Sequence, residues 1–211
     1  MLHIVNYKKA YGPTPVLQIE NLQLEAGIYW LKGENGSGKS TLLKSLAGLI
    51  PFEGQIEVEG LSLRKQRRLY TQTVSFAEAE PVFPLFLTGS ELLEFFLETK
   101  GGDKIDAMRI AENLGIAAFL KNKTATYSSG MMKKLSLLLC FAGRSKLLLL
   151  DEPFVTLDVA SVGVLRRLIV ERSETTSFLI STHQPLDLTV PSQSLRIVGQ
   201  TLQRESHATN A

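Results

Sequence analysis

The sequence predicts an α/β fold with a parallel core sheet, an antiparallel β edge and an inserted block of helices. Strand patterns lead the chain, strands and helices then alternate, and helix patterns alone fill the middle. Residues 147–150 form a continuous aliphatic run, which is typical of a strand covered on both faces. Because this strand follows the helical block, we expect the block, roughly residues 88–126, to be an insertion in one domain that spans residues 1–211.

The N-terminal part of the chain contains mainly strand patterns. Alternating or β-branched runs predict strands at residues 3–7, 16–20, 28–32, 55–59 and 74–77. Leucines at helical spacing predict a helix over residues 39–49, directly after a glycine-rich run that cannot continue a strand. This glycine-rich run is either a phosphate-binding loop or only a tight turn.

Helix patterns then dominate until the aliphatic strand. They predict helices at residues 90–99, 103–114, 116–120 and 129–142. After the strand at 147–150 we expect a helix at 158–172, strands at 177–181 and 196–198, and a polar tail at 205–211.

Composition excludes several classes of protein. Lys and Arg number 23 against 21 Asp and Glu, a net charge of +2, so no nucleic-acid partner is expected. One cysteine excludes a disulfide framework, and three histidines spread along the chain form no metal cluster. The most apolar window, 135–150, contains Arg144 and Lys146 and is shorter than the ~20 residues of a membrane span. Without a signal-peptide pattern, we expect a cytoplasmic protein.

A phosphate-binding loop joins the strand at 28–32 to the helix that follows it. The pattern Gly-x-x-x-x-Gly-Lys-Ser needs glycines so that successive backbone N–H groups face one phosphate at a helix N-terminus. Lys39 is expected to reach the β- and γ-phosphates, Ser40 to bind Mg²⁺, and Thr41 to contact the α-phosphate. The ATP-binding residues predicted here are Gly33, Glu34, Asn35, Gly36, Ser37, Gly38, Lys39, Ser40 and Thr41.

Two carboxylates follow the buried strand at 147–150. Ligands of open α/β sheets bind outside the carboxyl ends of the strands, so Asp151 and Glu152 are expected beside the loop. Asp151 is predicted to hold Mg²⁺ and Glu152 to polarise the attacking water. Up to this point a small kinase and an ATPase module both remain open. A GTPase is less favoured, because residues 122–125 lack the carboxylate that reads guanine.

Further segments resemble those of ABC-transporter ATPase subunits. Tyr-Ser-Ser-Gly-Met at 127–131, called the signature segment below, begins a helix as the family's signature motif does. Residues 154–158 are similar to its D-loop, and His183 after Ser181 and Thr182 to its switch histidine. Tyr11 is similar to the aromatic residue that stacks on adenine, with Tyr7 as a rival. Phe76-Ala77-Glu78 stands where the family has a strand followed by the Q-loop glutamine.

The resemblance implies a division of roles between two copies of the chain. Tyr11, Lys39, Ser40, Asp151 and Glu152 would act in the chain's own half of the site. His183 would contact the γ-phosphate, and Asp158 would act across the two-fold axis. The residues that would reach the nucleotide of the second copy are Ser128, Ser129, Gly130 and Met131.

The sequence departs from the family pattern at two places. Tyr127, Ser129 and Met131 replace the usual Leu, Gly and Gln of the signature, and this form resembles ATPases of two-gene exporters. Glu78 replaces the usual glutamine and is predicted to bind Mg²⁺, with Glu80 as a rival for the same position.

The resemblance also implies partners. We expect an ATP-dependent homodimer, a separate transmembrane subunit and a place on the inner face of the cell membrane. Two interpretations stay open for Phe83, Phe86, Phe95 and Phe96, which could belong to the core or to the surface that meets this partner. Two alternatives stay open. One is a haem-exporter-like ATPase of cytochrome c maturation, and the other is a soluble ABC ATPase without a transport role.

Overall fold

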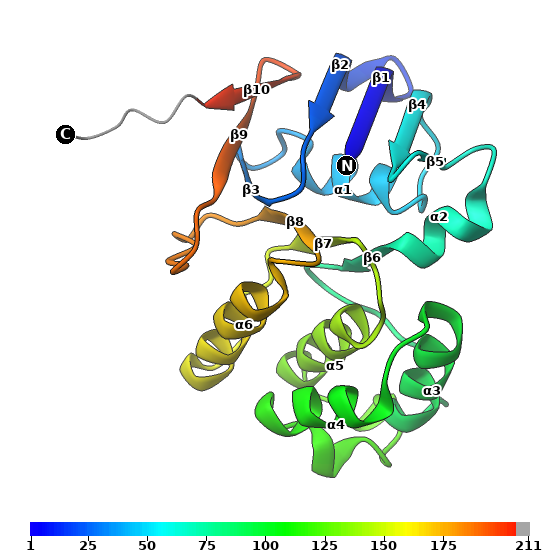
Figure 1. Cartoon of the computed structure of the whole chain (residues 1–211), viewed down its shortest axis with the longest axis vertical. Coiled ribbons are helices and arrows are strands. Elements are labelled where there is room, and N and C mark those ends of the chain that lie inside the picture. The colour runs from blue at the N-terminus through cyan, green and yellow to red at the C-terminus, as the bar shows by residue number, and fades with distance from the viewer. Residues whose placement is uncertain (206–211) are drawn as a thin grey trace.

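All strands of the computed structural model, which describes residues 1–205, belong to one ten-stranded sheet (Figure 1). The strands are β1 (Leu2–Tyr11), β2 (Thr14–Leu24), β3 (Ile28–Lys32), β4 (Glu53–Val58), β5 (Leu61–Ser62), β6 (Val74–Ala77), β7 (Leu147–Asp151), β8 (Ser177–Ser181), β9 (Gln193–Val198) and β10 (Thr201–Glu205). Their order in the sheet is β5-β4-β1-β2-β10-β9-β3-β8-β7-β6. The expected polar tail begins with the last residue of β10, and residues 206–211, with His207, lie outside the described part.

The sheet has a parallel half and an antiparallel half, as the sequence predicts. Strands β9, β3, β8, β7 and β6 run parallel to one another. Strand β1 pairs antiparallel with β2 and with β4. A single parallel register position, between Thr201 of β10 and Gln18 of β2, joins the two halves. The carboxyl ends of the core strands therefore meet at one edge.

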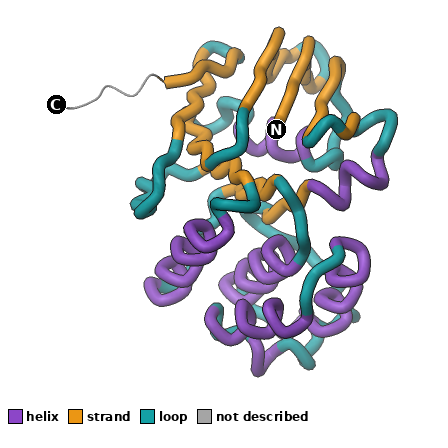
Figure 2. Tube along the Cα trace, in the orientation of Figure 1, coloured by secondary structure: helices purple, strands orange, loops and turns teal. Residues whose placement is uncertain are grey.

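Within residues 1–205, six α-helices and two short 3₁₀ turns accompany the sheet. They are α1 (Lys39–Leu46), α2 (Arg67–Thr73), α3 (Gly89–Lys100), α4 (Lys104–Asn113), η1 (Ala117–Phe119), η2 (Thr124–Thr126), α5 (Ser129–Ala142) and α6 (Val159–Arg172). Figure 2 shows α3, α4 and α5 gathered at one end of the molecule, with β1, β2 and β4 at the other. Among residues 1–205, no helix combines the length and the apolar character needed to cross a membrane.

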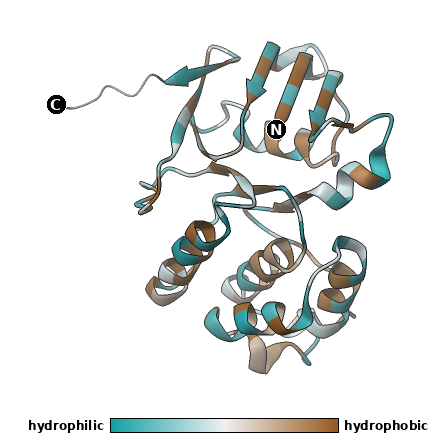
Figure 3. Cartoon of the chain, in the orientation of Figure 1, coloured by the Kyte–Doolittle hydropathy of each residue, from teal (hydrophilic) through white to brown (hydrophobic). Residues whose placement is uncertain are grey.

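Alternation along β7 explains why the core has two layers. Leu147 and Leu149 pack with α1 and the antiparallel strands, whereas Leu148 and Leu150 pack with α3 to α6. All four leucines are buried, because successive side chains of a strand point to opposite faces. Figure 3 shows the apolar colour on the central strands and on the inner faces of the helices.

The inserted helices begin and end at residues suited to those places. Thr88 forms a capping box with Glu91, and Gly101 ends α3 in the left-handed conformation with φ 66°. Asp103 then caps α4 by accepting a hydrogen bond from the Asp106 N–H. Hydrogen bonds from Thr88 lower the pKa of Glu91. These local signals explain why the helix boundaries follow the sequence closely.

Several local predictions need correction. The helix expected at 39–49 ends at Leu46, because Gly48 turns the chain with φ 73°. The helix expected at 116–120 is the 3₁₀ turn η1. Helix α2 and strands β5 and β10 have no counterpart in the sequence prediction. In α2 only Tyr70 is buried, so its sequence lacks an apolar stripe of helical period.

Candidate functional site

Four parallel strands place the predicted site residues at one edge of the sheet. Strand β3 leads into the glycine-rich loop, and β6 ends just before Glu78. Strand β7 ends at Asp151 and is followed by Glu152, and β8 is followed by Thr182 and His183. The direct register of β8 with both β3 and β7 fixes these strand ends as neighbours.

The glycine-rich loop, residues 33–38, borders an open cavity. Gly36 and Gly38 have φ 77° and 104°, a conformation that side chains disfavour. No side chain caps the N-terminus of α1, so its first N–H groups stay available to an anion. The cavity is about 460 Å³ and is lined by Thr14, Pro15, Val16, Gly33, Glu34, Asn35, Gly36, Ser37, Arg196, Ile197, Val198, Gly199 and Gln200.

Lys39 is buried and folds back over the loop. Its Nζ donates hydrogen bonds to the carbonyl oxygens of Gly33 at 2.8 Å and of Glu34 at 2.9 Å. The hydroxyl of Ser37 is buried in the same loop without a hydrogen-bond partner. A buried ammonium, an unpaired hydroxyl and free helix N–H groups together fit a phosphate chain. Ser40 is exposed and Thr41 half-buried on the first turn of α1.

Asp151 and Glu152 have different surroundings. Asp151 is 2% exposed, and its Oδ1 accepts a hydrogen bond from the Ser181 hydroxyl. Glu152 has φ 42°, and its N–H donates to the Ser181 carbonyl at 3.0 Å. The Oε1 of Glu152 is buried without a hydrogen bond, with His183 Nε2 at 3.5 Å. Glu152 therefore presents an unused acceptor beside a histidine, as the positioning of a water requires.

The predicted metal ligands fit Mg²⁺ only in part. Ser40 and Asp151 supply the hydroxyl and carboxylate oxygens that this ion prefers. The Glu78 carboxylate instead faces α1, with Oε1 at 3.9 Å from Lys44 Nζ. Across residues 1–205, no three acidic, histidine or cysteine side chains gather closely enough to hold a metal ion. Phosphate and water oxygens would have to complete the coordination of Mg²⁺.

The signature segment opens α5 away from the loop cavity. Ser128 caps the helix by accepting the Met131 N–H at 3.2 Å. Ser129 is exposed, and a Cβ on Gly130 would lie 3.2 Å from the Thr156 carbonyl oxygen. Among the described residues, none of these four lines the cavity of the glycine-rich loop. The same chain does not bring the signature segment to its own loop.

Tyr127, which departs from the family pattern, has a structural role. Its hydroxyl donates to the Phe119 carbonyl at 2.8 Å and so ties the signature segment to turn η1 of the insertion. Burial raises the pKa of this hydroxyl. A leucine at this place would fill space without making that link.

Asp158 is placed by two contacts at the start of α6. It accepts the Ser161 N–H at 2.8 Å and lies 2.7 Å from Lys134 Nζ of α5. The hydrogen bond from Lys134, followed by those from Ser161, holds the pKa of Asp158 well below its usual range. The D-loop residue is thereby linked to the helix of the signature segment.

The two tyrosines proposed for adenine stacking differ sharply. Tyr11 is 55% exposed at the end of β1, paired with Thr14, which lines the loop cavity. Tyr7 is fully buried, and its hydroxyl bonds Ser45 Oγ at 2.8 Å. Of the two, only Tyr11 is exposed enough to meet a nucleotide base, and Lys9 Nζ lies 4.6 Å from the centroid of its ring.

Sequence reasoning missed one group at the site, Lys133 of α5. Its side chain is fully buried, and its Nζ donates to three backbone carbonyls of the loops described above. Desolvation lowers its pKa to about 8. A lysine in register with the buried Leu137 and Cys140 was the available signal. The turn at 198–200, which lines the loop cavity, was also missed.

Comparisons with known proteins point to one family. The family model described as ABC transporter matches residues 17–155. The chain is 30% identical, over 86% of its length, to the linearmycin resistance ATP-binding protein LnrL of Bacillus subtilis strain 168, and spans 60% of that protein. It is 28% identical, over 89% of its length, to the cytochrome c biogenesis ATP-binding export protein CcmA of Idiomarina loihiensis, and covers 88% of it.

A solved structure titled as the ATP-binding subunit of an ABC transporter shares the fold. It superposes with a TM-score of 0.87 and 22% identity, over 98% of this chain and 90% of that one. Fold, family model and the convergence of the loop with Asp151, Glu152 and His183 lead to one assignment. The chain belongs to the ABC transporter family, as an ATP-binding ATPase domain of that family.

Proposed function

We propose that the chain is the ATP-hydrolysing subunit of an ABC exporter, closing as a homodimer on two ATP molecules and driving a separate membrane-spanning partner. The observation that carries this proposal is the buried, unpaired Oε1 of Glu152 beside His183 at the edge that carries the phosphate loop. A carboxylate kept free of hydrogen bonds at this place is suited to orient a water toward a phosphate.

The residues of one chain would share the chemistry as follows. Lys39 exchanges its two carbonyl partners for phosphate oxygens and neutralises their charge. Glu152 accepts a proton from the attacking water, and His183 holds that water and the terminal phosphate in register. Ser40 and Asp151 would hold Mg²⁺, which neutralises charge on the phosphates when bound.

Dimer formation is supported by where the signature segment lies. Ser128 and Gly130 sit at the exposed N-terminus of a 14-residue helix, whose N–H groups and dipole favour an anion. Because the segment does not line its own chain's cavity, a nucleotide held by a second copy is the phosphate it would meet. Each half-site would then need both chains.

An apolar groove supports a separate partner in the membrane. It has a volume of about 270 Å³ and lies between the core and the insertion, with Leu49, Phe76, Val82, Phe83 and Phe96 in its wall. Nearby, Val82, Phe86 and Phe95 are 84%, 72% and 58% exposed. A transmembrane subunit seated here would hold the chain on the inner face of the cell membrane.

A second candidate is an export ATPase of cytochrome c biogenesis. It is favoured by the similarity to CcmA, which is 28% identical over 89% of this chain. Purification of the tagged chain from membranes, with identification of the bound membrane protein, separates the candidates. Recovery of the chain without any membrane protein would favour an ABC ATPase that serves no transporter.

Replacement of Glu152 by Gln tests the chemistry directly. We expect turnover to fall by about 100-fold or more, because the general base is lost, while ATP binding persists. The variant should accumulate as an ATP-bound dimer on size exclusion. Glu174→Gln, on an exposed turn remote from the site, is the matched control and should behave as the wild type. Near-normal hydrolysis by the Glu152→Gln variant would refute the assignment.

A further inference from the structure

Lys133 uses all of its hydrogen-bonding capacity on backbone carbonyls. Its Nζ donates to the oxygens of Glu78 at 2.8 Å, Ala79 at 3.1 Å and Asp151 at 3.0 Å. An ammonium group has three N–H donors, so each donor has one partner. The side chain is 0% exposed, so bulk solvent does not reach it.

Packing alone does not explain a lysine at this place. Neighbours on the same face of α5, such as Leu137 and Cys140, are buried and apolar, and Met or Leu would fill the space without a buried charge. Among residues 1–205, no acidic side chain forms an ion pair with Lys133 within 4.0 Å. The buried charge is balanced by three carbonyl dipoles, and the charges of Asp151, Glu152 and Glu78 oppose the lowering of its pKa by burial.

The three carbonyls belong to segments that the proposed function requires to move or hold together. Glu78 and Ala79 begin the loop that leaves β6 for the helical insertion. Asp151 ends β7 and directly precedes Glu152. Lys133 itself lies in the second turn of α5, whose N-terminus is the signature segment. One side chain of the signature helix thus touches both the insertion loop and the strand end that precedes Glu152.

We propose that Lys133 is a positioning residue that couples the signature helix to the Glu78 loop and to the Asp151–Glu152 strand end of the same chain. The inference rests on the proposed function and adds to it the contacts that would link movement of α5 to the Glu78 loop and to Glu152. A displacement of α5 on closure against a second copy moves the ammonium and, through it, both carbonyl-bearing segments. A shift of about 1 Å in a reacting group is enough to cost roughly 100-fold in rate.

Three substitutions at this position test the coupling. Lys133→Met removes every donor, Lys133→Gln keeps an amide donor of shorter reach, and Lys133→Arg keeps charge and reach. We expect kcat for ATP hydrolysis to fall at least about tenfold in the Met variant and less in the Gln variant. The KM for ATP should stay within about threefold, because the phosphate loop is untouched, and the Arg variant should recover most of the activity.

Lys100 offers a matched control for the loss of a lysine that binds backbone carbonyls. Its Nζ donates to the carbonyls of Thr71 and Val74, at the opposite end of β6 from Glu78. Lys100→Met should lower the melting temperature as Lys133→Met does, yet leave the kcat of the isolated chain unchanged. A structural role for Lys133 would instead make the two variants alike in both measurements.

The outcomes separate this inference from the proposed function. Absence of ATP turnover in the wild-type chain would remove the proposed function itself. Wild-type turnover with an unchanged kcat in Lys133→Met would overturn the coupling alone. If the Met variant does not fold, Lys133→Gln decides: an unchanged kcat refutes the inference, and a selective fall in kcat with restoration by Arg supports it.

Discussion

Glu78 and Glu80 compete for the position that the resemblance assigns to the Q-loop glutamine. Glu78 is half-buried at the end of β6 with its carboxylate toward Lys44, whereas Glu80 is exposed further along the loop. Of the two, Glu78 is nearer in the chain to the strand end, but its carboxylate does not join Asp151 in a preformed metal site. Its role toward Mg²⁺ stays a prediction.

Replacing each glutamate by Gln separates the two residues. Glu78→Gln should retain hydrolysis and weaken apparent Mg²⁺ affinity by about threefold, since one partly exposed carboxylate contributes under 1 kcal/mol. Glu80→Gln should leave the Mg²⁺ dependence unchanged. Titration of ATP turnover with Mg²⁺ measures both. A loss confined to the Glu80 variant would place the metal-binding position two residues later.

The buried hydroxyl of Tyr7 should make the free energy of unfolding fall at alkaline pH. Burial raises the pKa of its hydroxyl from 10.0 to about 12, so folding favours the protonated form. Its contribution is complete below pH 10 and is lost as the pH rises toward 12. Tyr7→Phe should cost about 1 kcal/mol at neutral pH, through the lost bond to Ser45, and make the alkaline decline shallower.

Urea unfolding at pH 8 and pH 11 measures this difference. Tyr11→Phe is the control, because the ring is 55% exposed and its substitution should leave the free energy of unfolding nearly unchanged. An equally steep alkaline decline in Tyr7→Phe would show that other groups, such as the buried Tyr70, account for it.

At the scale of elements, helix α5 is proposed to present the signature segment to a second chain. Gly130→Asp should abolish ATP-dependent dimerisation, because a negative charge would face the terminal phosphate. Monomer affinity for ATP should stay within about twofold, since the segment does not line its own cavity. Fluorescent-nucleotide titration and size exclusion, both in a Glu152→Gln background, provide the two readouts.

Gly130→Ala is the control for space alone, because a Cβ there would lie 3.2 Å from the Thr156 carbonyl oxygen. If the alanine variant also fails to dimerise, crowding rather than charge explains the aspartate result. Loss of nucleotide binding by the Gly130→Asp monomer would contradict a role in trans.

The elements differ in how far sequence predicts them. The strands β3, β6 and β8 and helix α5 match their predicted bounds, because each has a strong apolar pattern between clear breaks. Helix α2 was missed because it buries one side chain only. The loop and strand-end residues follow from motifs, but the partners of Lys133 do not, because backbone carbonyls carry no residue-specific signal.

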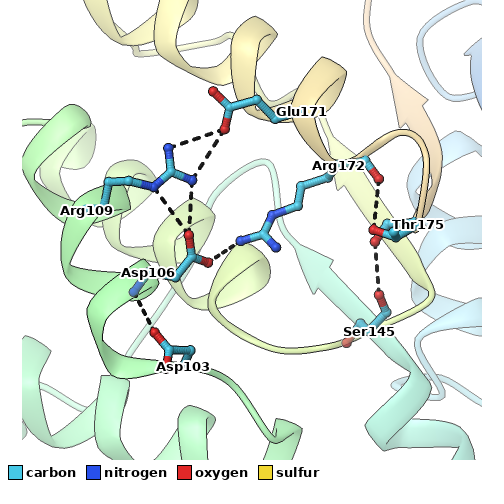
Figure 4. Close-up of polar contacts among 8 residues, drawn as sticks. Asp103, Asp106, Arg109, Ser145, Glu171, Arg172 and Thr175 are labelled. Atoms are coloured by element: carbon cyan, nitrogen blue, oxygen red, sulfur yellow. Dashed lines mark hydrogen bonds and ion pairs between the residues drawn. The ribbon is translucent and has the colours of Figure 1, made fainter.

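At the scale of the whole molecule, one ion-pair network joins the insertion to the core. Figure 4 shows Arg109 of α4 bonded to Asp106 and to Glu171 of α6, and Arg172 bonded to Asp106 as well. Asp106 therefore accepts from two arginines on two helices. The contacts resist relative movement of α4 and α6.

Asp106→Ala should lower the free energy of unfolding by about 1 kcal/mol, the upper range for exposed pairs, since several charges share the network. The loss should shrink in high salt, which screens partly exposed charges. Chemical denaturation with and without 1 M salt, roughly a 3 Å Debye length, measures it. Lys104→Ala, which removes a more exposed pair with Glu94, should change stability less. Equal losses in the two variants would show that the network adds nothing to single pairs.

The strand order also determines when the core sheet can be completed during synthesis of the chain. Strand β3 begins at Ile28 but lies between β8 and β9, which begin at Ser177 and Gln193. Nascent chains that end before Ser177 therefore expose both hydrogen-bonding edges of the strand that carries the phosphate loop. We therefore expect nucleotide binding only after β8 and β9 have left the ribosome, and until then the unpaired β3 is open to proteases and chaperones.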